Sequence, residues 1–203
     1  RQLVPREWCI VRRILDGRRH LILGDGGLTL HTFGYAENLA HAVLLAVDQP
    51  DVSAGQSYNC GDTQVWSLAQ VATTVARILE HPLEIVSVPG PFALPGQPLL
   101  AHESTSHRVM DLAKIRRELG YRDAVAPEEG LRRTVAWLLE HRPEPGGTTE
   151  RILGDTFDYA AEDAILAIQR DYEARLREVR YRERPGPGLS YVPPERRALA
   201  RAH

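Results

Sequence analysis

Lys114 is the one lysine of the 203-residue chain, and it limits the amine chemistry that the sequence can support. Any step through a Schiff base would depend on this residue. The residue four positions before it is Met110, so Lys114 does not belong to a Tyr-x-x-x-Lys proton relay. Asp, Glu and Tyr residues are numerous, but the sequence alone does not pair them into a general acid and a general base.

The glycine pattern also lacks the features of a phosphate-binding loop. Gly24, Gly26 and Gly27 lie between two predicted strands rather than at the start of a helix, and they do not form Gly-x-Gly-x-x-Gly. The backbone cradle for a dinucleotide pyrophosphate is therefore missing. No Gly-x-Ser-x-Gly or His-Glu-x-x-His occurs either. Hydrolase and metalloprotease functions thus have no motif to support them.

His102, Glu103 and His107 form the densest group of metal-binding residue types. The spacing of five between the two histidines does not place them on one face of a helix, and a loop rich in proline precedes them. We interpret them as solvated or hydrogen-bonded loop residues and predict no metal site.

The composition is that of an ordinary globular protein, with 43% hydrophobic and 26% charged residues and a net charge of -2. A general nucleic-acid binder would usually be strongly basic. Cys9 and Cys60 form no Cys-x-x-Cys pair, which favours a reducing compartment. No apolar run approaches the roughly 20 residues that span a bilayer. We therefore expect a cytoplasmic protein with neither a nucleic-acid nor a membrane partner.

Apolar periodicity predicts helices alternating with short strands, and these elements must position any site. Leu39, Val43 and Val47 repeat at helical spacing, and we expect their stripe to be buried. Ser67 followed by Gln70 has the form of a capping box. The expected helices are 4–16, 35–48, 67–79, 111–119 and 127–141, and the expected strands are 21–27, 28–33, 57–60 and 83–89.

The C-terminal part is expected to lie outside this domain, which we take to end at 141. Residues 142–157, which begin with RPEPGG, are interpreted as a linker, and 158–182 as an amphipathic helix. That helix either packs back on its own domain or pairs with another copy or another protein. Residues 183–203 form a basic tail that we expect to be disordered. A minor hypothesis is that this tail binds RNA or acidic lipid.

Six segments, read in order, resemble one family across residues 1 to about 141. They are GDGG at 24–27, HTFGYAENLAHAV at 31–43, SYNCGD at 57–62, SLAQVATTVARIL at 67–79, DLAKIRRELGY at 111–121 and EEGLRRTVAWL at 128–138. Together they are similar to the C-terminal half of the extended short-chain dehydrogenases, the NAD-dependent epimerase/dehydratase family.

The resemblance implies an α/β fold that contains the late sheet strands and a small mixed α/β substrate lobe, followed by an added C-terminal helix. In this family the preceding half is a doubly wound Rossmann sheet that binds NAD or NADP and carries the Tyr-x-x-x-Lys pair. The resemblance implies that this N-terminal cofactor domain is missing here. A lobe without the reactive groups can bind and orient a substrate but should not turn it over.

Site residues follow from the resemblance position by position. Family members often carry Arg-Asp-Phe or Arg-Asp-Tyr where this chain has His31, Thr32 and Phe33. In nucleotide-sugar enzymes of the family that arginine contacts the diphosphate. His31 is therefore the substrate-facing candidate, with Tyr35 as its neighbour. The alternative for His31 is a histidine at a strand end, hydrogen-bonded to the backbone.

A second family arginine, ten positions before Asp111, falls at Ala101, beside His102. His102 and Arg108 are the remaining substrate-binding candidates, although Arg108 also fits a plain surface arginine. A diphosphate is best held by bidentate guanidinium groups, for which a neutral imidazole is a poor substitute. The sequence therefore disfavours a nucleotide-diphosphate sugar as the substrate.

Two functions follow from these observations. The first is the substrate-binding portion of an NAD(P)-dependent epimerase, dehydratase or reductase that acts on a small carbonyl or hydroxyl compound, which could be sugar-like. The second is a non-catalytic binding or scaffold protein derived from that lobe. In both cases we predict that this chain alone neither binds the cofactor nor has dehydrogenase activity.

Overall fold

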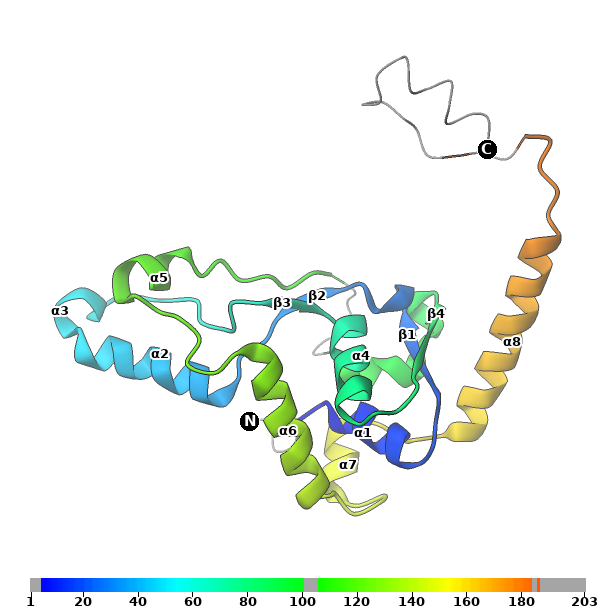
Figure 1. Cartoon of the computed structure of the whole chain (residues 1–203), viewed down its shortest axis with the longest axis horizontal. Coiled ribbons are helices and arrows are strands. Elements are labelled where there is room, and N and C mark those ends of the chain that lie inside the picture. Colours follow the sequence, from blue (N-terminus) through cyan, green and yellow to red (C-terminus); the bar gives the residue numbers. More distant parts are fainter. Residues whose placement is uncertain (1–4, 101–105, 184–185, 187–203) are drawn as a thin grey trace. The chain divides into compact units, whose positions relative to one another are not determined.

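A computed structural model of the chain describes residues 5–100, 106–183 and 186 (Figure 1). The chain divides into two compact units, Arg1–Ala167 and Ile168–His203. The helices are α1 (Trp8–Leu15), α2 (Ala36–Asp48), α3 (Pro50–Ser53), α4 (Leu68–Ile78), α5 (Ala113–Leu119), α6 (Pro127–Glu140), α7 (Thr148–Leu153) and α8 (Tyr159–Glu178). The strands are β1 (His20–Gly24), β2 (Leu30–Thr32), β3 (Val65–Ser67) and β4 (Glu84–Val88).

The strands form two small sheets in the first unit. β1 pairs in parallel with β4, and β2 pairs antiparallel with β3. The strands expected near 21–27, 28–33 and 83–89 are therefore confirmed, but the first two do not pair with each other. A 3-10 turn at Asp25–Gly27 leads the chain from one sheet to the other. The α/β class expected from the sequence is confirmed.

The strand expected at 57–60 is wrong, since no strand forms there and β3 lies further along the chain. Side chains rather than a neighbouring strand bind this segment. The Lys114 ammonium donates to the carbonyl oxygen of Ser57 at 3.1 Å. The Asn59 amide donates to the carbonyl oxygen of Asp111 at 3.3 Å.

The main core lies where α1, α4 and α6 pack together next to β1. Its buried members include Trp8, Ile14, Leu21, Val75 and Leu138. The predicted capping box of α4 is present: the Gln70 amide donates to Ser67 Oγ at 3.1 Å, and the Ser67 amide donates to Gln70 Oε1 at 2.8 Å. A capped N-terminus of this kind contributes about 1 kcal/mol.

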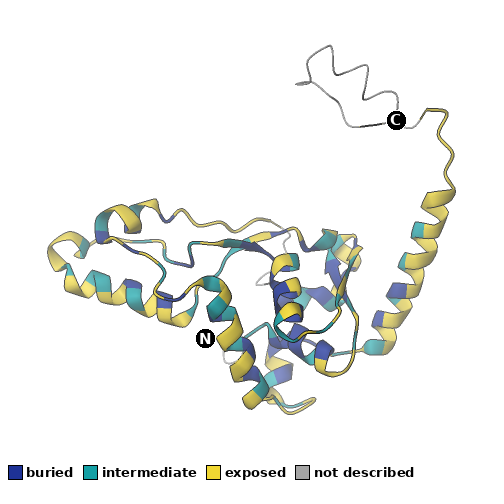
Figure 2. Cartoon of the chain, viewed as in Figure 1, coloured by how far each residue is buried: buried dark blue, intermediate teal, exposed yellow. Residues whose placement is uncertain are grey.

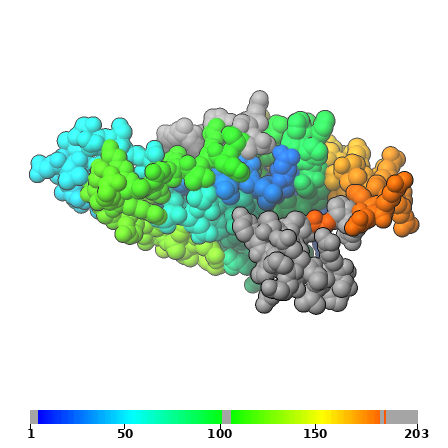
Figure 3. All heavy atoms as spheres, turned by 90° about the horizontal axis from the view of Figure 1, so that it is seen from above, coloured from blue at the N-terminus to red at the C-terminus, as the bar shows by residue number. Residues whose placement is uncertain are grey.

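Helices α2, α3 and α5 form a second, smaller lobe of the first unit, in which α3 and α5 lie side by side (Figure 3). Its core gathers Ala42, Ile115, Leu119 and Tyr121. The Tyr121 hydroxyl donates to the carbonyl oxygen of Gly61 at 2.9 Å, which connects this lobe to the segment before β3.

The expectation that the apolar stripe of α2 is buried is wrong. Val43 and Val47 are 63% and 66% exposed, whereas Asn38 and Ala42 are buried (Figure 2). The reason is the Asn38 amide, which donates to Asp62 at 2.8 Å and accepts from the Val125 amide at 2.9 Å. Because a buried amide needs these partners, Asn38 determines which face of α2 turns inward.

Residues 142–157, expected to be a linker, contain α7 and pack into the first unit. Leu153 belongs to the main core. The buried Glu150 carboxylate accepts a hydrogen bond from the Trp8 indole at 3.0 Å. The first unit therefore extends past the expected edge at 141 and includes the first turns of α8, where Leu166 packs with Ile22.

The second unit contains the rest of α8. Within it, the Arg175–Asp171 and Arg177–Glu173 pairs lie at 3.1 and 3.0 Å on the helix surface. Ile168 and Tyr172 are exposed. Across the described residues, none of the helices combines the length and the apolarity needed to cross a membrane.

Candidate functional site

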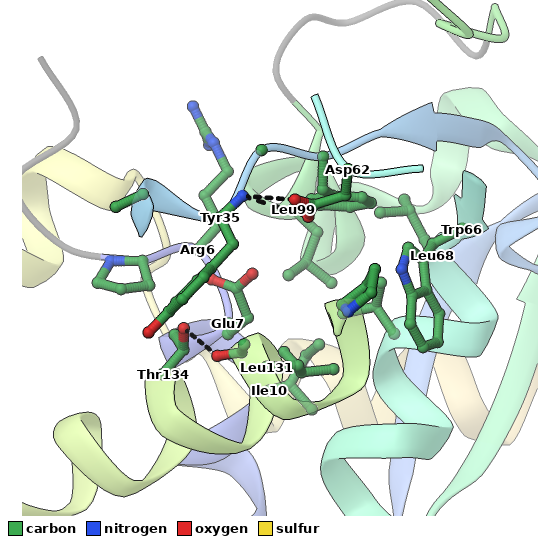
Figure 4. A pocket seen from close by; sticks show the side chains of 17 residues that line it. Arg6, Glu7, Ile10, Tyr35, Asp62, Trp66, Leu68, Leu99, Leu131 and Thr134 are labelled. Atoms are coloured by element: carbon green, nitrogen blue, oxygen red, sulfur yellow. Dashed lines mark hydrogen bonds between the residues drawn. The ribbon is translucent and has the colours of Figure 1, made fainter. Parts of the chain in front are cut away.

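A cavity of about 410 Å³ lies beside the N-terminus of α1, in the first unit (Figure 4). Its walls come from α1, the loop between β2 and α2, β3, α4 and α6. The wall is mainly apolar and includes Ile10, Phe33, Trp66, Leu68, Leu99 and Leu131. Its polar side chains are Arg6, Glu7, Tyr35, Asp62 and Thr134. A mainly apolar cavity of this size with a few polar groups is typical of a small-molecule site.

Tyr35, a predicted substrate-binding residue, lines this cavity. Its amide donates to the Asp62 carboxylate at 3.0 Å, and Asp62 is in turn bound by the Asn38 amide. Its ring packs directly on Gly130 of α6, where an added Cβ would lie only 2.8 Å from Tyr35 Cγ. The position of the Tyr35 ring therefore depends on a carboxylate before β3 and on a glycine in α6.

The Tyr35 hydroxyl donates to Glu37 Oε1 at 3.1 Å. Burial raises the pKa of Tyr35, and the hydrogen bond and charge of Glu37 raise it further, while Arg133 acts in the opposite direction. The hydroxyl therefore stays protonated at neutral pH and is poorly suited to act as a base.

Two further polar groups come from the start of α1 and were not predicted. Arg6 donates to the carbonyl oxygen of Pro98 at 2.5 Å. Glu7 lies at the N-cap of α1, where burial raises the pKa of its carboxyl and its own backbone and the Arg6 charge oppose that effect. An acidic residue just before an amphipathic helix is a signal for a helix start, but it does not indicate a cavity.

The structure brings His31 and Arg108 together, and neither lines the cavity, but the centroid of the His31 ring lies 6.0 Å from that of Phe33 in the cavity wall. The Arg108 amide donates to the carbonyl oxygen of Leu30 at 2.7 Å, and the Thr32 amide donates to that of Arg108 at 2.8 Å. Next to them, His107 Nδ1 accepts a hydrogen bond from the Leu30 amide at 3.0 Å. We call the three residues that these contacts bring together, His31, His107 and Arg108, the histidine–arginine corner.

Within this corner, His31 Nε2 is buried and has no hydrogen-bond partner among the described residues. Burial lowers the pKa of His31, and the nearby charges of Arg108 and His107 lower it further. The imidazole is therefore neutral at pH 7. His102, the remaining predicted substrate-binding residue, lies outside the described residues, as does Glu103. In the part of the chain that the structure describes, no three His, Cys, Asp or Glu residues gather in a way that could hold a metal.

A buried ionic cluster fixes the helix that carries Glu7 and Ile10. Arg13 of α1 is 1% exposed, and its guanidinium lies 2.6 Å from Asp155 and 2.7 Å from Glu162. Burial opposes its charge, but hydrogen bonds to the two carboxylates outweigh this effect and raise the pKa of Arg13. The residues that follow α6 thus hold α1 in place.

Several named proteins are similar in sequence to much of the chain, whereas no protein-family model matches it. The chain is 29% identical over 144 residues to dTDP-glucose 4,6-dehydratase of Neisseria meningitidis serogroup B, a match that covers 70% of this chain and 39% of the relative. It is 30% identical over 160 residues to the decarboxylating sterol-4-alpha-carboxylate 3-dehydrogenase of Schizosaccharomyces pombe, covering 68% and 46%. The chain thus spans less than half the length of these relatives.

The fold is similar to that of a UDP-glucuronic acid 4-epimerase from Bacillus cereus, solved in complex with NAD. The TM-score is 0.51 at 13% identity, and the match covers 68% of this chain and 40% of the epimerase. In sequence and in fold, the chain matches the C-terminal half of the NAD-dependent epimerases and dehydratases of the extended short-chain dehydrogenase family.

Proposed function

We propose that the chain is the substrate-binding portion of an NAD(P)-dependent epimerase, dehydratase or reductase that acts on a small carbonyl or hydroxyl compound. The observation that carries this proposal is the mainly apolar cavity with a few polar groups. It occurs in a chain that matches less than half the length of such enzymes. A cavity of this kind can hold and orient one molecule against a redox cofactor.

The glycine cluster of this chain does not fit the pyrophosphate of the cofactor. Gly26 and Gly27 lie in a 3-10 turn between β1 and β2, not at the N-terminus of a helix that could face a pyrophosphate. We therefore assign NAD or NADP to a separate N-terminal cofactor domain and derive no step of hydride transfer from this chain. Its own residues bind the substrate and exclude water from it.

The histidine–arginine corner supports a substrate without a diphosphate, because a histidine stands where a diphosphate-binding enzyme of the family has an arginine. His31 is neutral at pH 7 because burial and its neighbours lower its pKa. A neutral imidazole offers one donor, whereas an arginine offers a bidentate charged pair. We propose that His31, Arg108 and His102 face the polar end of the substrate and that Tyr35 lines its binding site. The two curated relatives carry the names of a nucleotide-sugar enzyme and a sterol enzyme, so both substrate types occur among them.

Two exposed apolar surfaces favour the presence of binding partners for the chain. On α2, Val43, Leu44 and Val47 are exposed, and we propose that the cofactor domain covers them. More than half the length of the curated relatives lies outside the match, which is enough for such a domain. On α8, Ile168 and Tyr172 continue a stripe at helical spacing, and we propose that this helix mediates self-association.

The experiment that tests the function is to sequence the DNA upstream of the codon for Arg1 and to titrate NADH with the purified chain. An upstream segment that ends in a Tyr-x-x-x-Lys pattern, together with no submicromolar NADH affinity for this chain alone, is the expected result. A start codon directly before Arg1 would favour the non-catalytic binding or scaffold protein. Tight NADH binding by the chain alone would contradict the proposal.

A further inference from the structure

Three arginines at and just after α5 line one open hollow on the surface of the first unit. Arg116 and Arg117 belong to the last turn of α5, and Arg122 follows that helix. The hollow has a volume of about 860 Å³, and the N-terminus of α6 forms another part of its wall. It differs from the cavity beside α1, although Pro127 lines both. The proposed function uses none of these arginines.

Most of the hydrogen-bond donors of the three arginines are unused, since each guanidinium carries five N–H groups. In the described part of the chain, Arg116 forms no hydrogen bond or ion pair, and Arg122 forms one hydrogen bond, from Nη1 to the carbonyl oxygen of Tyr121 at 2.8 Å. Arg117 pairs with Glu118 at 2.9 Å on the surface, where ion pairs are weak. The guanidinium groups can therefore bind a ligand without first losing strong partners.

The acidic residue of the wall, Asp123, is already bound within the protein. Its carboxylate accepts hydrogen bonds from the Thr63 amide at 3.1 Å and from the Thr63 hydroxyl. Glu128, at the start of α6, pairs with Arg77 at 2.8 Å. The wall itself combines three positive side chains with one negative side chain. The hollow is therefore a positively charged surface.

Helix polarity explains only part of this pattern. Arg116 and Arg117 stand in the last turn of α5, where a positive charge stabilises the C-terminus of a helix. Arg122 lies beyond the end of that helix, so this explanation does not apply to it. The N-terminus of α6 has no capping side chain and also attracts anions, but two glutamates in its first turn offset this attraction. The groups available to an anion are therefore the arginines.

We propose that this hollow binds a small molecule that carries a phosphate group, which Arg116, Arg117 and Arg122 hold. Guanidinium groups bind phosphate through paired, charge-assisted hydrogen bonds, and three of them suit a doubly charged phosphate better than a singly charged carboxylate. A volume of about 860 Å³ leaves room for the rest of the molecule. This inference goes beyond the proposed function, because the site lies outside the cavity assigned to the substrate.

Inorganic phosphate is the probe that tests the site, titrated into the full chain at constant ionic strength and followed by NMR. The backbone amide signals of Thr63 and Ala113 report binding, since both residues line the hollow. We expect these signals to shift in a saturable way, with a Kd on the order of 1 mM. Acetate, with a single charge, should bind at least about fivefold more weakly.

The variants that test recognition are Arg116→Gln and Arg122→Gln, each of which removes one guanidinium and keeps a polar side chain. Phosphate should bind roughly tenfold more weakly to each, the effect of losing a hydrogen bond to a charged group. Arg175→Gln is the matched control, because Arg175 is also exposed and pairs with Asp171 at 3.1 Å on α8, outside the hollow. Its affinity for phosphate should stay within about twofold of the parent. Melting temperatures verify that all three variants fold.

The phosphate proposal is overturned if phosphate gives no saturable shift, if acetate binds as tightly, or if Arg116→Gln and Arg122→Gln bind phosphate like the parent. An equal loss in Arg175→Gln would also overturn it, because the attraction would then come from the net charge of the protein. These outcomes are separate from the upstream sequence and the NADH titration, which test the proposed function. Either proposal can therefore fail without the other.

Discussion

Helices α1 and α2 show that a residue's polarity does not by itself decide its burial. Arg13 of α1 is 1% exposed, whereas Val43 of α2 is 63% exposed. α1 is covered by α4 and α6 and also by the residues around α7 and the start of α8. Among the residues that the structure describes, α2 is covered only on the face that carries Asn38 and Ala42. Burial therefore follows from which segments return to cover a helix.

The polar partners of the two helices explain this difference. Arg13 is buried because Asp155 and Glu162 neutralise it and bind its guanidinium. Asn38 is buried because Asp62 and the backbone of Val125 bind its amide. In both helices a buried polar side chain fixes the orientation, and the apolar residues must adapt to it.

Replacing Arg13 with methionine should have the largest effect on this comparison. The change leaves the buried Asp155 carboxylate without its countercharge and leaves Glu162 with the more distant Arg18 guanidinium at 3.9 Å, so we expect the free energy of unfolding to fall by about 3–5 kcal/mol. Urea unfolding followed by circular dichroism measures this change. Arg132→Met is the control, because Arg132 pairs with Glu129 at 3.5 Å on the surface, and it should cost less than about 1 kcal/mol. Equal effects of the two variants would show that the buried cluster is not what holds α1.

Replacing Gly130 with alanine should have the next largest effect, because the new Cβ would lie 2.8 Å from Tyr35 Cγ. We expect a loss of about 1–3 kcal/mol from this overpacking, partly offset by the higher helix propensity of alanine. The same substitution in a Tyr35→Ala background should be neutral or stabilising, since the clash is removed. If Gly130→Ala costs as much in that background, the ring of Tyr35 does not pack on α6 as described.

Glu7→Gln should have a smaller effect, and its sign depends on pH. Burial raises the pKa of Glu7 in the folded protein, so the folded state binds this proton more tightly than the unfolded state. The parent therefore loses stability as pH rises from the ordinary glutamate pKa through the raised one. The variant lacks this loss and should become the more stable of the two above that range. Melting temperatures of both proteins from pH 4 to pH 8 measure the difference, and a constant difference across that range would contradict the prediction.

Local features of the fold could be predicted from the sequence, and features that depend on distant segments could not. The capping box of Ser67 and Gln70 spans three residues, and the structure confirms it. The pairing of β1 with β4 joins segments about 60 residues apart, and its register could not be predicted from local patterns. Glu7 was missed because its importance depends on cavity walls from five separate parts of the chain. His31 and Arg108 were chosen from family positions, and the structure brings them together without testing their role.

The smallest expected effect comes from Val43→Gln, and it tests the proposal that a further domain covers α2. Since Val43 is 63% exposed, the change should alter the stability of this chain by less than about 0.5 kcal/mol. Ala42→Gln, one residue away on the buried face, should cost at least about 1–3 kcal/mol, because the larger side chain overpacks the lobe. If the cofactor domain covers α2, Val43→Gln should become costly in a longer protein that includes this domain, since a buried amide would then lack a partner. An equally small effect in the longer protein would mean that the cofactor domain does not cover α2. The α2 surface would then be exposed in the whole enzyme as well.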